Sequence, residues 1–333
     1  MKPRPMLTHL LGQMYGRAIQ VRNFLYDSGI ADQISISKPV LSVGNISVGG
    51  TGKTPVVEKI ISICLEKGLR PCLVARNYKA QSVGIHQVDL SRTGGACFYG
   101  DEAYSIAEKF PQVPVFTGPR KAETARHAEK VSSFDLLLVD DGFQHRALHR
   151  DFDIVLVDVT AEKDENCLLP EGRLREEFGS LERSSLVVLT KVNWASETAV
   201  QEIQKQIPAQ IEQVQLEFSQ KPKKEIPEGC RVLAVSGIAR PLVFEQGLKS
   251  MGAAPVESLR FPDHHPYGQE DLIKIIQKCR SLDCGQILTT EKDFVKLKEF
   301  PELLPFLNPI ELQLKFKTEP RGLYAFLDQC LGR

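Results

Sequence analysis

Five continuous apolar runs dominate the first two thirds of this 333-residue chain. They cover residues 39–48, 70–76, 134–142, 152–158 and 184–191. A run without polar alternation suits a parallel strand that is buried on both faces, and helical patterns separate the runs here. The chain is therefore predicted to be an α/β protein with a mostly parallel sheet flanked by helices.

The first run leads into the segment SVGGTGKT, which ends with Gly-Lys-Thr. A phosphate-binding loop usually reads Gly, four residues and Gly-Lys-Ser/Thr, and Ser47 takes the place of its first glycine. Glycines let backbone N–H groups wrap around phosphates, the lysine reaches the β and γ oxygens, and the hydroxyl binds Mg²⁺. The predicted nucleotide-binding residues are Ser47, Val48, Gly49, Gly50, Thr51, Gly52, Lys53 and Thr54.

Two acidic residues, Asp140 and Asp141, follow the apolar run that begins at residue 134. Adjacent carboxylates at a strand end need a compensating cation, and Mg²⁺ prefers oxygen ligands of this kind. We therefore predict that Thr54 and Asp140 or Asp141 hold Mg²⁺. The segment LTKVN resembles a guanine-reading motif, but Asn193 replaces its acidic residue, so guanine specificity is not predicted.

The N-terminal segment combines an apolar stripe with positive charge. The stripe consists of Leu7, Leu10, Leu11, Met14, Ala18, Val21 and Leu25, and the charge comes from Lys2, Arg4, Arg17 and Arg22. A helix with this pattern can pack its stripe into a core or lay it on an anionic membrane surface. The arginines interrupt any signal-peptide core, and no run approaches the roughly 18 apolar residues of a spanning helix.

Composition narrows the range of partners and compartments. Lysine plus arginine and aspartate plus glutamate number 42 each, so the net charge of zero does not predict nucleic-acid binding. Eight cysteines are scattered without a Cys-x-x-Cys pair, which predicts reduced thiols in a cytosolic environment. No protein partner is predicted.

A polar stretch with two prolines at 219–230 predicts a domain boundary. Beyond it, 231–239, 254–261 and 286–293 have strand patterns and 270–279 has a helical one, which predicts a smaller α/β domain. The segments 214–218 and 310–316 alternate apolar and polar residues on either side of that domain, and we expect them to pair as a β-ribbon linker.

Further polar clusters permit both functional and structural interpretations. Asp101 and Glu102 open a helical segment, where they complement the helix dipole or take part in chemistry. His145 and Arg146 follow the paired aspartates and suit an anionic ligand. His264 and its neighbour histidine lack further ligands for zinc, so a histidine acting with a carboxylate is the simpler interpretation.

Together these motifs resemble the tetraacyldisaccharide 4'-kinase family. The resemblance rests on VGNISVGGTGKTPVV, GDE (100–102), DDGFQHR (140–146), LLPEGRLRE (168–176), SGIARP (236–241), FPDHH (261–265) and TEKD (290–293). The chain departs from the family pattern in three places. Family Ser-Arg-Gly-Tyr-Gly reads Ala-Arg-Asn-Tyr-Lys at 75–79, GDEP reads GDEA, and LPAGPLRE reads LPEGRLRE.

The resemblance implies ATP as phosphate donor and the 4'-hydroxyl of the tetraacyldisaccharide 1-phosphate precursor of lipid A as acceptor. It implies that Lys53 neutralises the transferred phosphoryl group and that Asp101 takes the hydroxyl proton, with His264 orienting Asp101 or sharing its proton. Glu176 is a further metal ligand by similarity. The substrate-binding residues implied are Arg76, Tyr78, Glu102, Arg120, His145 and Arg146.

An acylated substrate stays in the bilayer, so the resemblance favours membrane contact by the N-terminal helix. The expected location is peripheral, at the cytoplasmic face of the inner membrane of a Gram-negative-type bacterium. The expected domains are an amphipathic helix (1–30), a P-loop kinase core (31–212), a β-ribbon linker (213–223 with 309–317), a small domain with the catalytic histidine (224–308) and a C-terminal helix (318–333).

Two other classes of protein share parts of this pattern. A nucleotide-driven switch or metallochaperone of the P-loop superfamily would bind partners without transferring phosphate to a small acceptor. An ATP-dependent ligase similar to dethiobiotin synthetase would use the same loop. The FPDHH segment argues against the first class, and the N-terminal stripe argues against the second.

Overall fold

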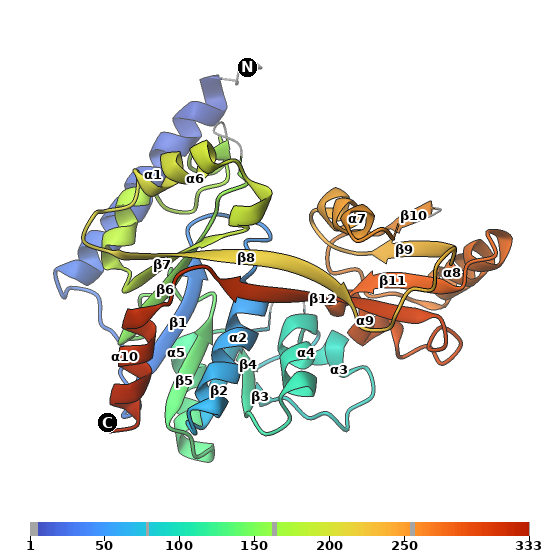
Figure 1. Cartoon of the computed structure of the whole chain (residues 1–333). Coiled ribbons are helices and arrows are strands. Elements are labelled where there is room, and N and C mark those ends of the chain that lie inside the picture. Colours follow the sequence, from blue (N-terminus) through green and yellow to red (C-terminus); the bar gives the residue numbers. More distant parts are fainter. Residues whose placement is uncertain (1–5, 78–79, 162–164, 254–256, 333) are drawn as a thin grey trace. The chain divides into compact units, whose positions relative to one another are not determined.

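The computed structural model describes residues 6–77, 80–161, 165–253 and 257–332. The chain divides into two compact units. Unit 1 comprises Met1–Arg76, Arg120–Phe218 and Leu314–Arg333, and unit 2 comprises Asn77–Pro119 and Ser219–Gln313. The helices and strands of both units are labelled in Figure 1.

The sheet of unit 1 is parallel and has the strand order β8-β7-β6-β1-β5-β2. Its strands are β1 (Val40–Asn45), β2 (Pro71–Arg76), β5 (Leu136–Asp140), β6 (Phe152–Asp158), β7 (Leu186–Thr190) and β8 (Glu212–Pro222). Residues of β1, β5, β6 and β7 are buried throughout, as the continuous apolar runs predicted. The predicted P-loop-type parallel sheet is therefore confirmed.

Helices of unit 1 cover this sheet. They are α1 (Met6–Asp27), α2 (Lys53–Glu66), α5 (Lys121–Val131), α6 (Glu197–Gln204) and α10 (Arg321–Cys330), with short 3₁₀ turns η2 (Phe178–Arg183) and η3 (Val192–Trp194). Helix α2 buries Val56, Val57, Ile60, Ile61 and Cys64, the face that the spacing predicted. One core cluster joins Val155 and Val157 of β6 to Val187 of β7 and Ile203 of α6.

The sheet of unit 2 contains the parallel order β10-β9-β11-β12. Its elements are β9 (Val232–Ser236), α7 (Pro241–Ser250), β10 (Glu257–Arg260), α8 (Gln269–Ser281), β11 (Gln286–Thr290), α9 (Glu291–Leu297) and β12 (Leu307–Phe316). The chain leaves β9 for β10 on one side and later returns to β11 on the other side. Such a reversal of strand order is a topological switch point, and ligands of α/β sheets commonly bind beside the carboxyl ends of the strands there.

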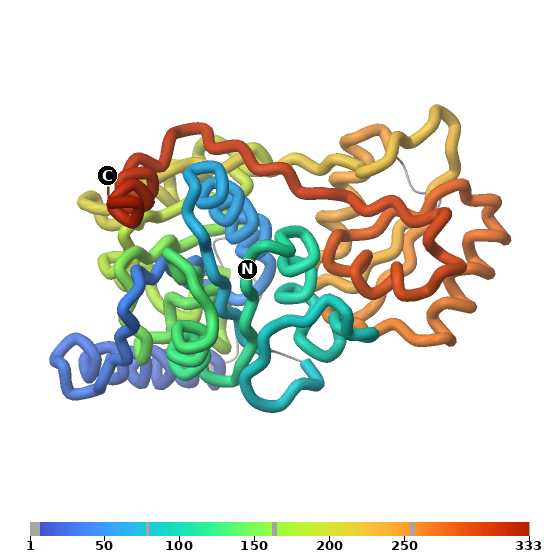
Figure 2. The backbone as a smooth tube through the Cα atoms, turned by 90° about the horizontal axis from the view of Figure 1, so that it is seen from below, coloured from blue at the N-terminus to red at the C-terminus, as the bar shows by residue number. Residues whose placement is uncertain are grey.

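Residues 77–119 belong to unit 2, although they were predicted to be part of the P-loop core. This segment carries β3 (His86–Gln87), α3 (Gly95–Tyr99), α4 (Asp101–Lys109) and β4 (Val115–Gly118), and Figure 2 follows it in blue-green. Tyr99 of α3 and Tyr104 of α4 share a core cluster with Val295 of α9. This packing between segments far apart in sequence explains the assignment.

Strands β8 and β12 are neighbours, and each has residues in both units. The amide of Lys317 donates to the Gln215 carbonyl at 2.9 Å, and the amide of Lys223 donates to the Pro309 carbonyl at 3.0 Å. The residue numbers run in opposite directions, so the two strands are antiparallel. The predicted β-ribbon is therefore present.

The apolar stripe of α1 faces solvent. Leu7, Leu10, Met14 and Val21 are 65%, 54%, 58% and 60% exposed, and Leu11, Ala18 and Leu25 are exposed as well. The opposite face packs through Gly12 and Gly16, which lie against residues 168–171. The interpretation of the stripe as a core surface is therefore wrong. In the described part of the chain, no helix has the length and apolar character needed to span a bilayer.

Candidate active site

The phosphate loop connects β1 to α2, as the sequence predicted. Gly49 and Gly52 have φ angles of 105° and 90°, in the left-handed region that favours glycine. A Cβ on Gly52 would lie 2.5 Å from the ring of Phe218, so the close approach also requires glycine. Lys53 and Thr54 are the first two residues of α2, where their side chains can contact a phosphate bound at the helix N-terminus.

The paired aspartates lie at the same edge of the sheet as this loop. Val43 of β1 is in register with Asp140, the last residue of β5. Asp141 follows with a φ of 51°, and its carboxylate lies 3.6 Å from Lys53 Nζ and 2.9 Å from Arg175 Nη1. The buried Lys121 donates from Nζ to the Asp141 carbonyl oxygen at 2.6 Å.

Burial and charge together set the ionisation of this group. Burial opposes the charged form of Asp141, but the cations Lys53, Lys121 and Arg175 outweigh it and hold its pKa well below the usual range. Burial also lowers the pKa of Lys121 to about 8, although Asp141 and Asp140 oppose this shift. Burial and the nearby Lys121 lower the pKa of His145 to about 4, so this imidazole is neutral at pH 7.

The donor set near the loop suits Mg²⁺. Thr54 offers a hydroxyl, and Asp140 and Asp141 offer carboxylate oxygens. Mg²⁺ in nucleotide sites takes one or two carboxylates and completes its shell with phosphate oxygens and water. Such a site does not require a cluster of three acidic or imidazole ligands, and none occurs among the described residues.

Glu176 has different partners from those expected of a metal ligand. Its carboxylate is fully buried, lies 3.3 Å from Arg22 Nη2 and 2.5 Å from Arg183 Nη2, and accepts a hydrogen bond from Asn23. Two guanidinium groups thus compensate this charge and tie α1 to the residues around η2. The arrangement favours a structural role for Glu176 over Mg²⁺ binding.

The predicted substrate-binding residues fall into several environments. Arg76 ends β2 and lies near enough to His145 and Lys121 to affect the pKa of both. Arg120 is exposed and pairs with Glu123 at 2.8 Å. Arg146 is buried and pairs with Asp27 at 2.6 Å, which departs from the prediction of a substrate contact. Tyr78 lies outside the described residues.

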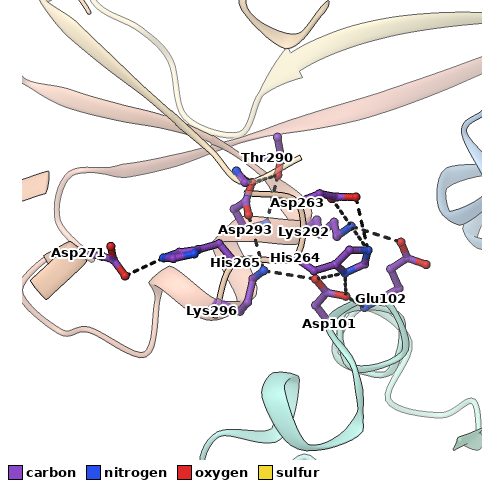
Figure 3. Close-up of polar contacts among 11 residues, drawn as sticks. Asp101, Glu102, Asp263, His264, His265, Asp271, Thr290, Lys292, Asp293 and Lys296 are labelled. Atoms are coloured by element: carbon purple, nitrogen blue, oxygen red, sulfur yellow. Dashed lines mark hydrogen bonds and ion pairs between the residues drawn. The ribbon is translucent and has the colours of Figure 1, made fainter. Parts of the chain in front are cut away.

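A second polar cluster lies in unit 2 (Figure 3). Asp101 opens α4 and is 7% exposed, and both of its carboxylate oxygens lie near His264 Nδ1, at 3.1 and 3.0 Å. Lys296 of α9 donates to Asp101 at 3.3 Å. Asp101 and His264 were predicted to lie in separate domains, but both belong to unit 2.

Backbone contacts fix His264 against the loop that follows β9. Its amide donates to the Gly237 carbonyl at 3.2 Å, and the amide of Gly237 donates to Asp293 at 2.8 Å. The φ angle of His264 is 63°, a conformation that costs energy for a residue other than glycine. Strained backbone of this kind persists where surrounding contacts fix a side chain for function.

Lys292 completes the cluster on the far side of the imidazole. Its Nζ lies 3.0 Å from His264 Nε2, 3.3 Å from Asp263 and 3.6 Å from Glu102. A lysine ammonium has only donors, so Nε2 accepts from it and Nδ1 donates to Asp101. Burial disfavours the charged form of Asp101, but His264, Lys292 and Lys296 outweigh it and lower its pKa to about 2.

Several of these functional groups were not predicted from the sequence. Arg175 stands in the LPEGRLRE segment, and Lys292 in the TEKD segment, but spacing gave neither a partner. Lys121 and Lys296 look like ordinary surface lysines in the sequence. Only long-range packing brings them to Asp141 and Asp101.

The strand–loop–helix unit, with Lys53 and Thr54 at the helix start and aspartates at the next strand end, defines a P-loop nucleotide-binding protein equipped for phosphoryl transfer. The family model for tetraacyldisaccharide-1-P 4'-kinase matches residues 5–332. The chain therefore belongs to this family of kinases.

Individual relatives agree with this family over nearly their whole length. The tetraacyldisaccharide 4'-kinase of Bdellovibrio bacteriovorus is 36% identical over 96% of this chain and 98% of its own. That of Anaeromyxobacter sp. (strain Fw109-5) is 34% identical over 94% of this chain and 88% of its own. The solved structure of LpxK from Aquifex aeolicus in complex with ATP has a TM-score of 0.74 and 28% identity, covering 95% of this chain and 97% of that chain. These matches identify the protein as a kinase and not as a switch, a metallochaperone or a ligase.

Proposed function

We propose that this chain transfers the γ-phosphate of ATP to the 4'-hydroxyl of the tetraacyldisaccharide 1-phosphate precursor of lipid A, with Asp101 accepting the hydroxyl proton. Family membership supports the donor and acceptor, and the Aquifex relative is solved with ATP. The observation that carries the choice of base is the buried Asp101 carboxylate, held by His264 at 3.0 Å and Lys296 at 3.3 Å.

The sugar 4'-oxygen forms a bond to the γ-phosphorus, the bond from that phosphorus to the bridging oxygen breaks, and ADP leaves. The hydroxyl proton passes to Asp101 and then to solvent. A carboxylate with a pKa of about 2 is a weak base. It suits a loose transition state, in which the attacking oxygen releases its proton late.

His264 is proposed as the residue that orients Asp101. Its Nε2 faces the Lys292 ammonium at 3.0 Å, so that nitrogen carries no second proton in this arrangement. The imidazole therefore donates through Nδ1 and fixes the carboxylate in place. Of the two roles expected for His264, the contacts favour orientation over proton sharing.

The ATP phosphates are proposed to lie in the loop Ser47–Thr54, where Lys53 reaches the transferred phosphoryl group. Thr54 and Asp140 or Asp141 would hold Mg²⁺, which neutralises charge on the β- and γ-phosphate oxygens when bound. Arg175 and Lys121 add positive charge at Asp141. Arg76, Arg120, His145 and Glu102 remain proposed substrate contacts, as does Tyr78.

The exposed stripe of α1 is proposed to rest on the cytoplasmic face of the inner membrane, where an acylated substrate resides. The row that includes Leu10, Met14 and Val21 faces solvent and does not pack in a core. Such an apolar row suits insertion among lipid headgroups. Arg17 is also exposed and can meet anionic lipid. Lys2 and Arg4 lie outside the described residues.

An acceptor assay tests the proposed function. Labelled γ-phosphate of ATP is offered with tetraacyldisaccharide 1-phosphate in mixed micelles, and in parallel with a soluble disaccharide that lacks acyl chains. We expect transfer to the lipid acceptor, its loss with EDTA and its recovery with Mg²⁺. ATP hydrolysis without transfer to the lipid, or EDTA-resistant transfer, would contradict the proposal.

A further inference from the structure

The start of the phosphate loop is hydrogen-bonded to the segment that contains Arg173. The amide of Val48 donates to the Arg173 carbonyl at 2.8 Å, and the amide of Arg175 donates to the Ile46 carbonyl at 2.7 Å. Ser47 and Leu174 form an antiparallel bridge between these two bonds. The start of the loop is thus paired as a short β-ladder with residues 173–175.

The side chain of Arg173 continues this contact. Its Nη2 donates to the Val48 carbonyl oxygen at 2.7 Å, while its Nη1 donates to Glu165 at 3.2 Å. A Cβ placed on Gly49 would lie 1.9 Å from Nη2, so the guanidinium group lies directly against that glycine. Arg173 therefore binds Val48 through both its backbone and its side chain.

A second cation holds the carbonyl two residues further along the loop. Lys191 Nζ donates to the Gly50 carbonyl at 2.7 Å and to Asp158 at 2.5 Å. Both side chains of this ion pair are buried. The carbonyls of Val48 and Gly50 are thus each bound by a cation whose charge is balanced by its own carboxylate, Glu165 or Asp158.

Carbonyl orientation determines where the next amide points. In a trans peptide the C=O and the following N–H point in opposite directions. When Arg173 holds the Val48 carbonyl, the Gly49 N–H must therefore face away from Arg173. Amides that are fixed before the ligand arrives lower the entropic cost of binding phosphate.

We propose that Arg173 is a positioning residue that sets the phosphate loop for ATP without touching ATP itself. The inference rests on the proposed use of ATP and deepens it. The family pattern LPAGPLRE has proline at this position, which offers neither a guanidinium group nor a backbone N–H. The device therefore distinguishes this chain from that pattern.

The test compares Arg173→Met and Arg173→Lys with Arg70→Met in the full-length protein. Arg70 also pairs with a carboxylate, Asp135 at 2.7 Å, but lies on the surface away from the loop. The dissociation constant of ATP is measured by fluorescence titration with a labelled non-hydrolysable analogue. KM for ATP, KM for the acceptor and kcat are measured beside it, and thermal unfolding without nucleotide checks the fold.

We expect Arg173→Met to raise the dissociation constant and KM for ATP roughly 10- to 150-fold, the range for loss of one charge-assisted hydrogen bond. kcat and the acceptor KM should stay near wild type. Arg173→Lys should recover part of the affinity, because an ammonium can reach Val48 without bridging to Glu165. Arg70→Met should match wild type.

A wild-type dissociation constant in Arg173→Met would overturn the proposal, as would a fall in kcat with unchanged ATP affinity. If Arg173→Met does not fold, the same comparison is made with Arg173→Lys and Glu165→Gln, and wild-type affinity in both would overturn it. The ATP titration needs no acceptor. Failure of transfer to the lipid would therefore count against the proposed function and leave this inference standing.

Discussion

His264 directs Nδ1 to both carboxylate oxygens of Asp101, at 3.1 and 3.0 Å. On the opposite side of the ring, Nε2 faces the Lys292 ammonium at 3.0 Å. Nδ1 therefore serves as a donor and Nε2 as an acceptor, so neither ring nitrogen is available to take a proton from the substrate.

This relationship predicts different outcomes for two substitutions of His264. His264→Ala should lower kcat by up to ~10²–10⁴-fold, the range for loss of a general base, because Asp101 loses the contact that orients it. The kcat of His264→Asn should be at least about ten-fold higher than that of the alanine variant, because an amide NH₂ can take the place of Nδ1–H. Asparagine also tolerates the left-handed φ of 63° at this position.

Steady-state kinetics at saturating ATP measures the difference. If the alanine and asparagine variants were equally slow while both bound ATP normally, His264 would have to carry the proton. The orienting role would then be wrong.

The lowered pKa of Asp101 predicts how stability depends on pH. The folded-state pKa of about 2 lies below the ordinary value of 3.8, so the ionised group stabilises the fold above about pH 4. This contribution, about 2 kcal/mol, is lost as pH falls toward 2. Urea unfolding of wild type and Asp101→Asn should show a stability gap that narrows between pH 4 and pH 2. A gap that is constant or widens over this interval would count against the ion pairs around Asp101.

The exposed stripe of α1 predicts that a double substitution within it will weaken membrane binding without unfolding the protein. Leu10→Glu with Met14→Glu should weaken liposome binding about 100-fold, because two apolar side chains no longer leave water. KM for the lipid acceptor should rise, and KM for ATP should not change. Vesicles with anionic phospholipid and flotation measure the binding.

The matched control places two glutamates elsewhere. Leu242 and Ile273 are 59% and 53% exposed and lie outside α1. Leu242→Glu with Ile273→Glu should float with vesicles as wild type does. Equal loss of binding in both double variants would show that added negative charge, and not the stripe, is responsible.

Substitution of Glu176 should reduce stability, and this effect distinguishes a structural role from metal binding. Glu176→Gln leaves Arg22 and Arg183 without a buried counter-charge and should cost about 3 kcal/mol of unfolding free energy. The neighbouring Glu177 is exposed, so Glu177→Gln should be neutral. A normal unfolding midpoint in Glu176→Gln, together with a higher Mg²⁺ requirement, would return Glu176 to the metal site.

Local features of the sequence predicted the parts of the site that depend on neighbouring residues. The loop before Lys53 carries its own signals in the glycines and in the pattern of the flanking strand and helix. Asp140 was predicted from the end of an apolar run, and the register of β1 with β5 brings it to the loop. The second inference also needs the rule that the carboxyl ends of parallel strands lie at one edge of a sheet.

Long-range packing determined the rest. The placement of 77–119 depends on contacts of Tyr104 with residues near Val295, and no local pattern encodes them. The stripe of α1 was ambiguous because core and membrane surfaces require the same periodicity. Arg146 looked like an anion ligand beside the aspartates, but folding turns it toward Asp27. The pairing of Asp101 with His264 came from family resemblance.

The proposed role of Asp101 as the base is tested by single-turnover transfer of γ-phosphate to tetraacyldisaccharide 1-phosphate by Asp101→Asn, at saturating ATP and Mg²⁺. We expect a transfer rate ~10²–10⁴-fold below that of the wild type. The ATP dissociation constant should be unchanged, because the phosphate loop is intact. A near-wild-type transfer rate in Asp101→Asn would show that Asp101 is not the base.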